Sequence, residues 1–310
     1  MANAYPTLID IAVANSADPV VGLIEESIKA CPELTMGAAR TIKGLNYKTL
    51  IRTALPAAAF RNANEGTSAV KGTYESRLVE TFLLNPVWNA DQAVADGFED
   101  GAAAFIAMEG LGLVEASMRQ LSAQFYYGRN TTFGGDAKGH FGLLDSLDTA
   151  NMVVDAGGTT DNTATSVWAV KFGPQDVQWV WGKNGDLKLS DPVIQQISDA
   201  NGGLYPAYVQ NLLARPGLQI GRKQSIARIK KITADVGKTL TDKLLSSLLM
   251  LFPAGWRPDV FLMNRRSLGQ LQQSRTATNP TGAPAPIPDS AFGVPIALTD
   301  SISSIETLAL

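Results

Sequence analysis

The histidine and cysteine content limits the chemistry available to this chain. Among its 310 residues there is one histidine, His140, and one cysteine, Cys31. A metal site built from several histidines is therefore impossible, and a nucleophile–histidine pair would have to use His140. His140 lies in the glycine-rich stretch 128–142, and the chain has no G-x-S-x-G nucleophile elbow. We expect no catalytic residues and no enzyme, with a soluble hydrolase or ligand-binding protein that uses this loop as an alternative.

Other motifs with possible ligands are equally weak. Gly237-Lys238-Thr239 resembles the end of a phosphate-binding loop, but the glycine required five positions earlier is replaced by Ile232, which favours a turn before a helix. The carboxylates show no metal-ligand spacing, so we expect no metal and no cofactor. A basic run favours a solvated face over a phosphate-contacting patch, because the whole chain is acidic. It comprises Arg222, Lys223, Arg228, Lys230 and Lys231.

Composition places the chain among globular proteins. Apolar residues make up 45% and charged residues 18% of the sequence. A net charge of −3 and a pI near 5.3 argue against a dedicated nucleic-acid binder. One cysteine fits a reducing cytoplasm, and residues 1–16 lack the basic start of a signal peptide. The apolar run Leu248–Phe252, like every other apolar run of the sequence, is too short to span a bilayer. We therefore expect a soluble intracellular protein without a membrane partner.

The dominant element expected is one long helix over residues 89–128. Apolar residues recur every three or four positions from Val94 to Phe125, which is the spacing of a buried helical stripe. Asn89 suits the N-cap, and Gly128 suits the left-handed residue after the last turn. Four internal glycines cost about 1 kcal/mol each relative to alanine, so they predict a soft, curved scaffold helix. They are Gly97, Gly101, Gly110 and Gly112.

Two long strands are expected before this helix, at 47–52 and 74–84. They are rich in Thr, Tyr and Val, and Asn64-Glu65-Gly66 between them is a turn signal. Their charges fall on both faces, so neither face is suited to burial in its own domain. Two interpretations stay open: a solvated hairpin, or a projecting arm that contacts a neighbouring molecule. The second predicts inter-subunit contacts at Lys48, Arg52, Arg61, Lys71, Glu75, Arg77 and Glu80.

The remaining chain predicts a mixture of short elements. Asp18-Pro19 is a helix start within an N-terminal arm. Residues 165–190 favour an antiparallel meander whose core is anchored by Trp168, Trp179 and Trp181, with Asn184-Gly185 as a hairpin turn. The other elements are expected as helices at 205–213, 241–252 and 267–274, strands at 225–233, 260–263 and 294–298, and an extended proline-rich loop at 276–290.

In its order of parts, the chain resembles the major capsid protein of tailed bacteriophages. The most specific pieces are Gly157–Gly173 with Val177–Gly182, followed by Arg228–Ile232, Asp259–Asn264 and Phe292–Ile296, which look like strands of phage head proteins. The resemblance covers essentially the whole chain. It implies an α+β fold of the Hong Kong phage type, with arm, extended loop, spine helix, peripheral domain and axial domain.

The resemblance also implies how the chain is divided. The N-terminal arm would be residues 1–36 and the extended β-hairpin loop 37–88. The peripheral-type domain would be residues 89–144, with the spine helix at 89–128. The axial-type domain would be residues 145–290, and residues 291–310 would carry a final strand back toward the peripheral domain.

The function implied is a shell protein that self-assembles into pentamers and hexamers around double-stranded DNA. Its expected partners are other copies, a separate scaffolding protein, a portal, a possible decoration protein and DNA held by non-specific contacts. The expected location is the virion, after assembly in the bacterial host cytoplasm. An encapsulin-like nanocompartment shell is an alternative within the same fold.

Overall fold

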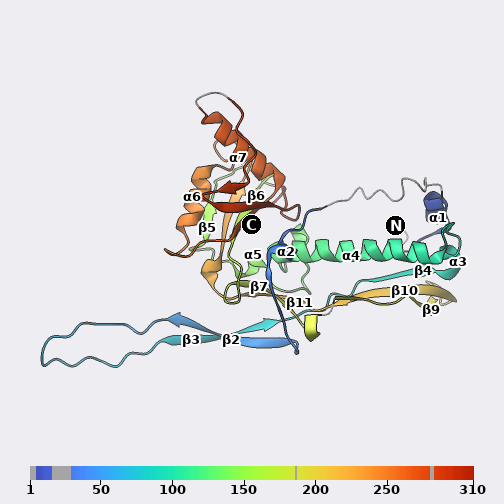
Figure 1. The fold of residues 1–310 in the computed structure, drawn as a ribbon, viewed down its shortest axis with the longest axis horizontal. Helices are drawn as coiled ribbons and strands as arrows, with labels where there is room; N and C mark the ends of the chain where they lie inside the picture. The colour runs from blue at the N-terminus through green and yellow to red at the C-terminus, as the bar shows by residue number, and fades with distance from the viewer. Residues whose placement is uncertain (1–4, 16–28, 186, 280–282) are drawn as a thin grey trace.

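The computed structural model describes residues 5–15, 29–185, 187–279 and 283–310. Helix α4 (Ala102–Tyr127) connects two packed regions, and the hairpin of β2 (Asn46–Ala54) and β3 (Thr73–Glu80) projects beyond the larger one (Figure 1). We call the larger region, which contains α5–α7 and most of the strands, the body. The smaller region at the far end of α4 contains α1, α3, β4, β9 and most of β10, and we call it the lobe.

A six-stranded mixed sheet forms the centre of the body, in the order β14-β15-β13-β6-β12-β5. Its strands are β5 (Val153–Asp155), β6 (Thr165–Val170), β12 (Ile226–Ile232), β13 (Val260–Met263), β14 (Ser290–Ala291) and β15 (Val294–Leu298). Helices α6 (Asp242–Met250) and α7 (Arg265–Ala277) cover one face and bury leucines against it. The other face, which includes Trp168, packs against the end of α4.

Two smaller sheets extend from the body toward the lobe. One has the order β1-β7-β11, with β1 (Ala38–Thr41), β7 (Val177–Trp181) and β11 (Pro216–Ile220). The other pairs β10 (Leu204–Ala214) with β4 (Val87–Asp91), β8 (Leu187–Leu189) and β9 (Val193–Ser198). The short helices are α1 (Leu8–Asn15), α2 (Glu33–Met36), α3 (Gln92–Ala95) and α5 (Leu143–Ser146), with 3₁₀ turns at Thr131–Phe133, Lys183–Gly185 and Lys223–Ser225.

The long helix is shorter than the sequence predicts. Residues 87–91 form strand β4, in which Asn89 pairs with Val209, so the predicted N-cap at Asn89 is wrong. The helix begins only after Gly101, whose φ of +89° is favourable for glycine alone. Its stripe is also discontinuous: Phe105 packs in the lobe and Phe125 in the body, while Leu111 between them is 73% exposed. The helix therefore links two cores rather than burying one continuous face.

Two other sequence expectations are wrong because distant strands supply the pairing. The predicted helix at 205–213 is strand β10, which is held between partners from residues 87–91 and 193–198. The predicted meander at 165–190 is divided: β6 pairs with β12 and β13, whereas β7 pairs with β1 and β11. Asn184-Gly185 lies in a 3₁₀ turn, and β8 pairs with β10 instead of β7.

Several local predictions are confirmed. Helices α6 and α7 and strands β13 and β15 lie at the predicted positions, and 226–232 is a strand inside the large sheet. Thr241 caps α6 by accepting a hydrogen bond from the Leu244 amide. Trp168 and Trp179 are buried in one cluster, and Trp181 packs half-buried against it. The predicted helix start at Asp18-Pro19 lies outside the described residues.

Candidate assembly interface

The β2–β3 hairpin presents two distinct faces. Antiparallel pairing places Tyr47 opposite Val79 and Thr49 opposite Arg77, and these pairs are at least half-buried toward the body. The alternate pairs point outward, because successive residues of a strand face opposite sides. They include Lys48 with Leu78 and Arg52 with Tyr74. The charges therefore do lie on both faces, as the sequence predicts.

Contacts at its base attach the inner face to strand β11. The Tyr47 hydroxyl donates a short hydrogen bond to the Gln219 side chain, and Arg77 Nη1 donates to the Ile220 carbonyl at 3.0 Å. Further out, the hairpin and the body border a cleft of about 830 Å³. Its lining includes Glu75 from the hairpin and Lys223 from the body. Of the seven predicted contact residues, Arg77 is the one that the chain itself already uses to hold the hairpin.

The outer face combines charge with exposed apolar surface. Lys48, Arg52 and Glu80 are exposed there, and the Arg52 guanidinium lies 5.3 Å from the centre of the Tyr74 ring. Leu50 is 74% exposed on the same face, and Leu78 is also exposed. Exposing such leucines adds no stability to a monomer. An apolar surface bordered by charged side chains is typical of an interaction site.

At its tip the hairpin forms a small turn of its own. Residues 52–71 are exposed throughout, including Arg61 and Lys71. The Arg61 guanidinium donates to the Glu65 carbonyl at 3.0 Å, and the Glu65 carboxylate accepts from the Asn62 side chain at 2.9 Å. Asn64 adopts a positive φ of 67° within this turn, which agrees with the predicted turn signal. The turn leaves Phe60 fully exposed beside it.

These apolar side chains are the part of the interface that sequence reasoning missed. The prediction named only charged residues, whereas Leu50, Leu55, Phe60 and Val70 are among the most exposed large apolar residues of the hairpin. A signal was present: Phe60 stands in a small, polar segment without a periodic apolar partner. It could not have been recognised without knowing that the segment projects away from the body.

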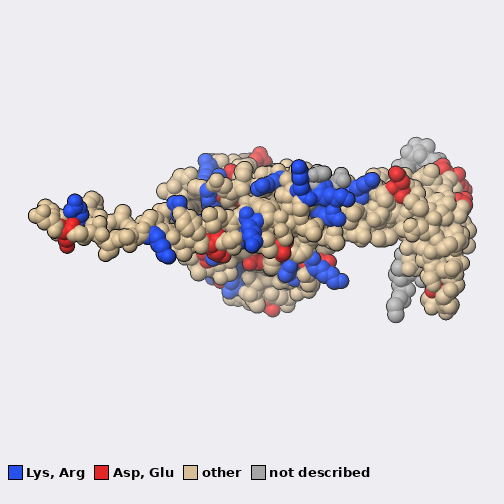
Figure 2. Space-filling view, turned by 90° about the horizontal axis from the view of Figure 1, so that it is seen from below, with Lys and Arg blue, Asp and Glu red and all other residues tan. Residues whose placement is uncertain are grey.

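Surface charge is divided along the molecule. Figure 2 shows lysines and arginines spread over the body among scattered acidic residues, whereas the opposite end shows acidic residues without lysine or arginine. Residues 87–110 of the lobe carry five carboxylates and no lysine or arginine. These are Asp91, Asp96, Glu99, Asp100 and Glu109. The small net charge of the chain therefore conceals an electrical asymmetry, which favours head-to-tail contact between copies over contact between like ends.

The alternative site around His140 is part of the core. The His140 ring is buried and packs edge-on against Trp179, with the ring centroids 5.6 Å apart. Its Nδ1 lies 2.9 Å from the Phe141 carbonyl, and burial lowers the pKa of the imidazole to about 4. The Gln124 amide donates to the His140 carbonyl at 2.6 Å, which ties the glycine loop to α4. This arrangement stabilises a neutral structural histidine.

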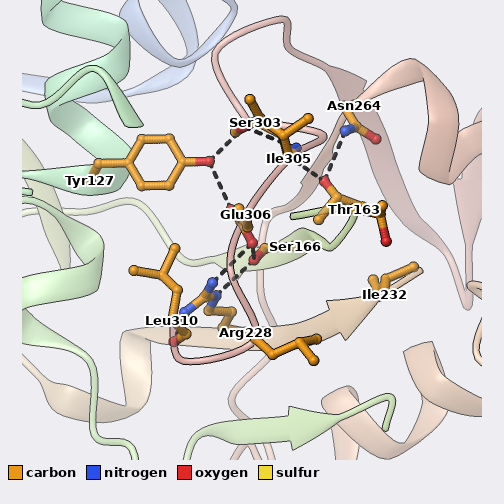
Figure 3. A network of polar contacts seen from close by, with 12 residues as sticks. Tyr127, Thr163, Ser166, Arg228, Ile232, Asn264, Ser303, Ile305, Glu306 and Leu310 are labelled. Atoms are coloured by element: carbon orange, nitrogen blue, oxygen red, sulfur yellow. Dashed lines mark hydrogen bonds and ion pairs between the residues drawn. The ribbon is translucent and has the colours of Figure 1, made fainter. Parts of the chain in front are cut away.

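One predicted surface charge lies instead in the interior. Arg228, from the basic run, is 1% exposed, so its interpretation as part of a solvated face or phosphate patch is wrong. Its guanidinium is 3.1 Å from the Glu306 carboxylate, which also accepts from the Tyr127 hydroxyl at 2.7 Å (Figure 3). Ser166 completes the network by accepting from Arg228 at 2.8 Å. Burial, followed by the charge of Glu306, raises the pKa of Tyr127.

This network attaches the C-terminal segment to the body. The Ser303 amide donates to the Tyr127 hydroxyl at 2.7 Å, and Arg228 also donates to the Leu310 carbonyl at 2.8 Å. Its groups come from α4, β6, β12 and residues 303–310, which is the arrangement of a structural clasp. Ion pairs buried in this way are fully hydrogen-bonded because an unpaired buried charge is costly.

The motif Gly237-Lys238-Thr239, which resembles part of a phosphate-binding loop, has a structural explanation. Gly237-Lys238-Thr239 forms a turn before α6, with Gly237 at φ +73°. Asp235 in this turn accepts hydrogen bonds from Thr160 and Thr159, which lower the pKa of its carboxyl group. Within the described ranges, no group of three or more His, Cys, Asp or Glu residues could hold a metal ion. In the same part of the chain, no helix is long and apolar enough to cross a membrane.

A projecting arm with an exposed tip, a helix that links two cores and a divided surface charge define the class of the chain. Such features are typical of a subunit whose contacts are completed by other subunits. The family model for Major capsid protein GP7 matches residues 16–307, and the chain therefore belongs to this family of phage capsid proteins. This family match confirms the predicted function, which is that of a major capsid protein forming the shell of a tailed phage.

The comparison with solved structures bears on the fold. The chain is similar to a protein in a structure of bacteriophage Epsilon15, with 20% identity and a TM-score of 0.75 over 99% of this chain and 98% of that one. This similarity confirms the α+β phage-capsid fold. The capsid of Myoviridae phage XM1 (11% identity, TM-score 0.49) covers 70% of this chain and 97% of its own. The SrpI encapsulin of Synechococcus elongatus (10% identity, TM-score 0.49) covers 74% and 96%. No curated protein matches.

Proposed function

We propose that copies of this chain assemble into pentamers and hexamers of an icosahedral shell around double-stranded DNA, and that hairpin β2–β3 is the arm that joins neighbouring copies. One observation carries the proposal: residues 52–71 are exposed throughout a projecting hairpin whose base is fixed to the body by Arg77. Beyond its base, an arm that is exposed in this way adds little stability to its own subunit. Its apolar and charged side chains are available to a neighbour.

The proposed division of the chain follows that role. Residues 1–36 act as the N-terminal arm, 37–88 as the extended loop, 89–144 as the peripheral-type domain, 145–290 as the axial-type domain and 291–310 as the returning strand. Within the peripheral-type domain, the spine helix is α4, which is shorter than the helix at residues 89–128 that the sequence predicts. The lobe at the start of α4 then supplies the acidic surface that complements a basic hairpin.

Individual contacts in the proposed interface are weak. Exposed ion pairs are worth about 0–1 kcal/mol each, and salt screens them. Repetition over a closed shell makes many weak contacts strong together, while each one can adapt to five-fold and six-fold surroundings. The charged residues proposed to contact neighbours are Lys48, Arg52, Arg61, Lys71, Glu75 and Glu80. Arg77 is assigned the supporting role of holding the hairpin base.

The other partners belong to the same proposal. A separate scaffolding protein and a portal would direct assembly in the host cytoplasm, and a decoration protein could bind the finished shell. Packaged DNA would be held by confinement and by non-specific phosphate contacts. The chain would act structurally, without catalysis or a cofactor, since the buried imidazole of His140 offers no accessible base.

An encapsulin-like shell is the alternative within this fold, and it is disfavoured by the family match over residues 16–307. A hydrolase built on the loop around His140 is disfavoured by the burial of that ring.

Negative-stain microscopy of the expressed protein, alone and with a candidate scaffolding protein, tests the proposal. We expect closed shells of uniform diameter built from rings of five and six copies. Monomers under every assembly condition, or open fibres without closure, would contradict it.

A further inference from the structure

An apolar cleft of about 510 Å³ lies where α2, α4, β7 and β8 meet. Its large apolar lining residues are Leu34, Met118, Leu121, Trp181 and Leu187. Trp181 and Leu34 are only partly buried, although both pack against the main core. The cleft is therefore an extension of the core that the described residues leave open, and an apolar side chain placed there would complete the packing.

Charged side chains surround this cleft. Lys29 and Arg119 border it together with Glu115. Arg119 Nη2 lies 2.7 Å from the Glu115 carboxylate, whose side chain is still 48% exposed. An apolar floor with charges of both signs at its rim suits an aromatic anchor flanked by charges of its own.

The tip of the hairpin carries such an anchor. Phe60 is fully exposed, with Arg61 next to it and Glu65 across the turn. The turn is fixed by hydrogen bonds within residues 61–65, so Phe60 is presented from an ordered structure. A large, rigid aromatic side chain loses little conformational entropy on binding, which makes it a strong contact residue.

The tip cannot reach the cleft of its own chain. Figure 1 shows the hairpin tip beyond the body, at the end away from the lobe, whereas α2 lies level with the hairpin base and the middle of α4 lies farther from the tip still. A hairpin tip that fills this cleft must therefore come from another molecule. A second copy supplies both the aromatic anchor and the matching charges.

We propose that Phe60 of one copy inserts into this cleft of the next copy, where Arg61 lies close to the partner's exposed carboxylate at position 115. The inference rests on the proposed role of the hairpin as an inter-subunit arm, and it names the surface that the arm engages. Tip and cleft are different surfaces, so the contact is heterologous and repeats head-to-tail around a ring.

The single cysteine of the chain allows a direct test, because Cys31 also lines the cleft. We would substitute Phe60→Cys, assemble shells and treat them with a short bismaleimide, which tolerates more variation in geometry than a disulfide does. Each copy then offers one thiol at its tip and one in its cleft. We expect a ladder of crosslinked dimers, trimers and larger species on a denaturing gel.

Two controls separate this contact from others. The double variant Phe60→Cys/Cys31→Ser should lose the ladder and retain at most dimers joined at their tips. Val236→Cys places a thiol at an equally exposed site on the turn before α6 and should give no Cys31-dependent product. If Phe60→Cys assembles poorly, mixed shells with excess unsubstituted chain should still give a dimer that depends on Cys31.

A second measurement uses no crosslinker. Phe60→Ala should raise the subunit concentration needed for assembly about tenfold, while Phe60→Leu should restore most of the loss. Met118→Trp, which fills the cleft, should reproduce the defect. Shells that form normally but give no Cys31-dependent crosslink would overturn this inference and leave the proposed function intact. Failure of the unsubstituted chain to form any shell would instead overturn the proposed function.

Discussion

The best-buried charges of the body are paired within the chain, whereas several charges on hairpin β2–β3 face outward. Arg228 and Glu306 are each 1% exposed and form a buried network with Tyr127 and Ser166. Lys48 and Arg52 are exposed beside Leu50 and Leu78 on the outer face of the hairpin, which the described residues leave uncovered. The buried charges of the body therefore stabilise the subunit itself, and we propose that the outer face of the hairpin is covered only beside another molecule. Substitutions should accordingly separate into two groups, one affecting unfolding and the other affecting assembly.

The largest effect on folding should come from Trp179→Ala. Trp179 is 2% exposed, stacks on Phe125 with centroids 5.5 Å apart and donates to the Glu33 carbonyl at 3.1 Å. We expect a loss of about 5 kcal/mol, at the top of the range for a buried tryptophan, measured by denaturant unfolding. Leu50→Ala on the outer hairpin face is the matched control and should change stability by at most about 0.5 kcal/mol. Equal losses would show that the hairpin packs on its own subunit.

Arg228→Ala should follow closely. Removing the guanidinium leaves the Glu306 carboxylate buried without its ion-pair partner, at a cost of about 3–5 kcal/mol. Limited proteolysis should also show release of residues 303–310, because the clasp to Tyr127 is weakened. Arg52→Ala, an arginine on the exposed hairpin face, should leave the unfolding free energy almost unchanged. A stable Arg228→Ala protein would contradict the interpretation of the network as a structural clasp.

The pH dependence of stability offers a third comparison, within the body. Burial raises the pKa of Glu33 from 4.5 to about 7. Between these pH values the native state holds a proton that the unfolded state has lost, so the free energy of unfolding falls as the pH rises. Burial lowers the pKa of His140 from 6.5 to about 4, so stability rises with pH in that window. The two slopes, each about 1.4 kcal/mol per pH unit, oppose one another between pH 4.5 and 6.5.

We therefore expect a nearly flat stability profile for the unsubstituted chain in that range. Glu33→Gln should reveal a rise from pH 4 to 6.5, and His140→Asn should reveal a fall from pH 4.5 to 7. Chemical denaturation at half-unit pH intervals would measure both. Identical profiles for the two variants would show that these groups are not buried as described.

A smaller effect is expected from charge reversal on the hairpin. Lys48→Glu should weaken assembly by about 0–1 kcal/mol per contact at low salt, and the difference should disappear above about 0.5 M salt. Light scattering during assembly would follow it. Its unfolding curve should match that of the unsubstituted chain. A salt-independent defect would indicate that Lys48 acts through packing instead of charge.

The parts of the fold that sequence predicts well are those determined locally. Helix α6 has its threonine cap and regular leucines, and the hairpin has its turn signal, so both lie where expected. The failures concern β4 and β10, whose apolar spacing fits either a helix or a strand until the pairing partner, about 120 residues away, is known. Strand β6 is buried on both faces, so its alternation of residue types carried no information about its neighbours.

The candidate interface was only partly predictable for a related reason. Alternating charge showed that the hairpin buries no face in its own domain, but it could not distinguish Arg77, which holds the base, from Lys48, which points outward. The apolar contribution of Leu50 and Phe60 required knowing which side of each strand the body covers. Arg228 was misread because a basic run gives no indication that a carboxylate 78 residues later is folded beside it.

Deleting the hairpin tip tests the central claim most directly. Residues 57–69 would be replaced by a short Gly/Ser bridge, and thermal unfolding and shell formation would be measured on the same preparation. Because the tip contributes no buried contact to its own subunit, we expect near-normal unfolding together with loss of closed shells. A truncated protein that still closes into intact shells, or one that unfolds outright, would contradict the assignment of the hairpin as the arm between subunits.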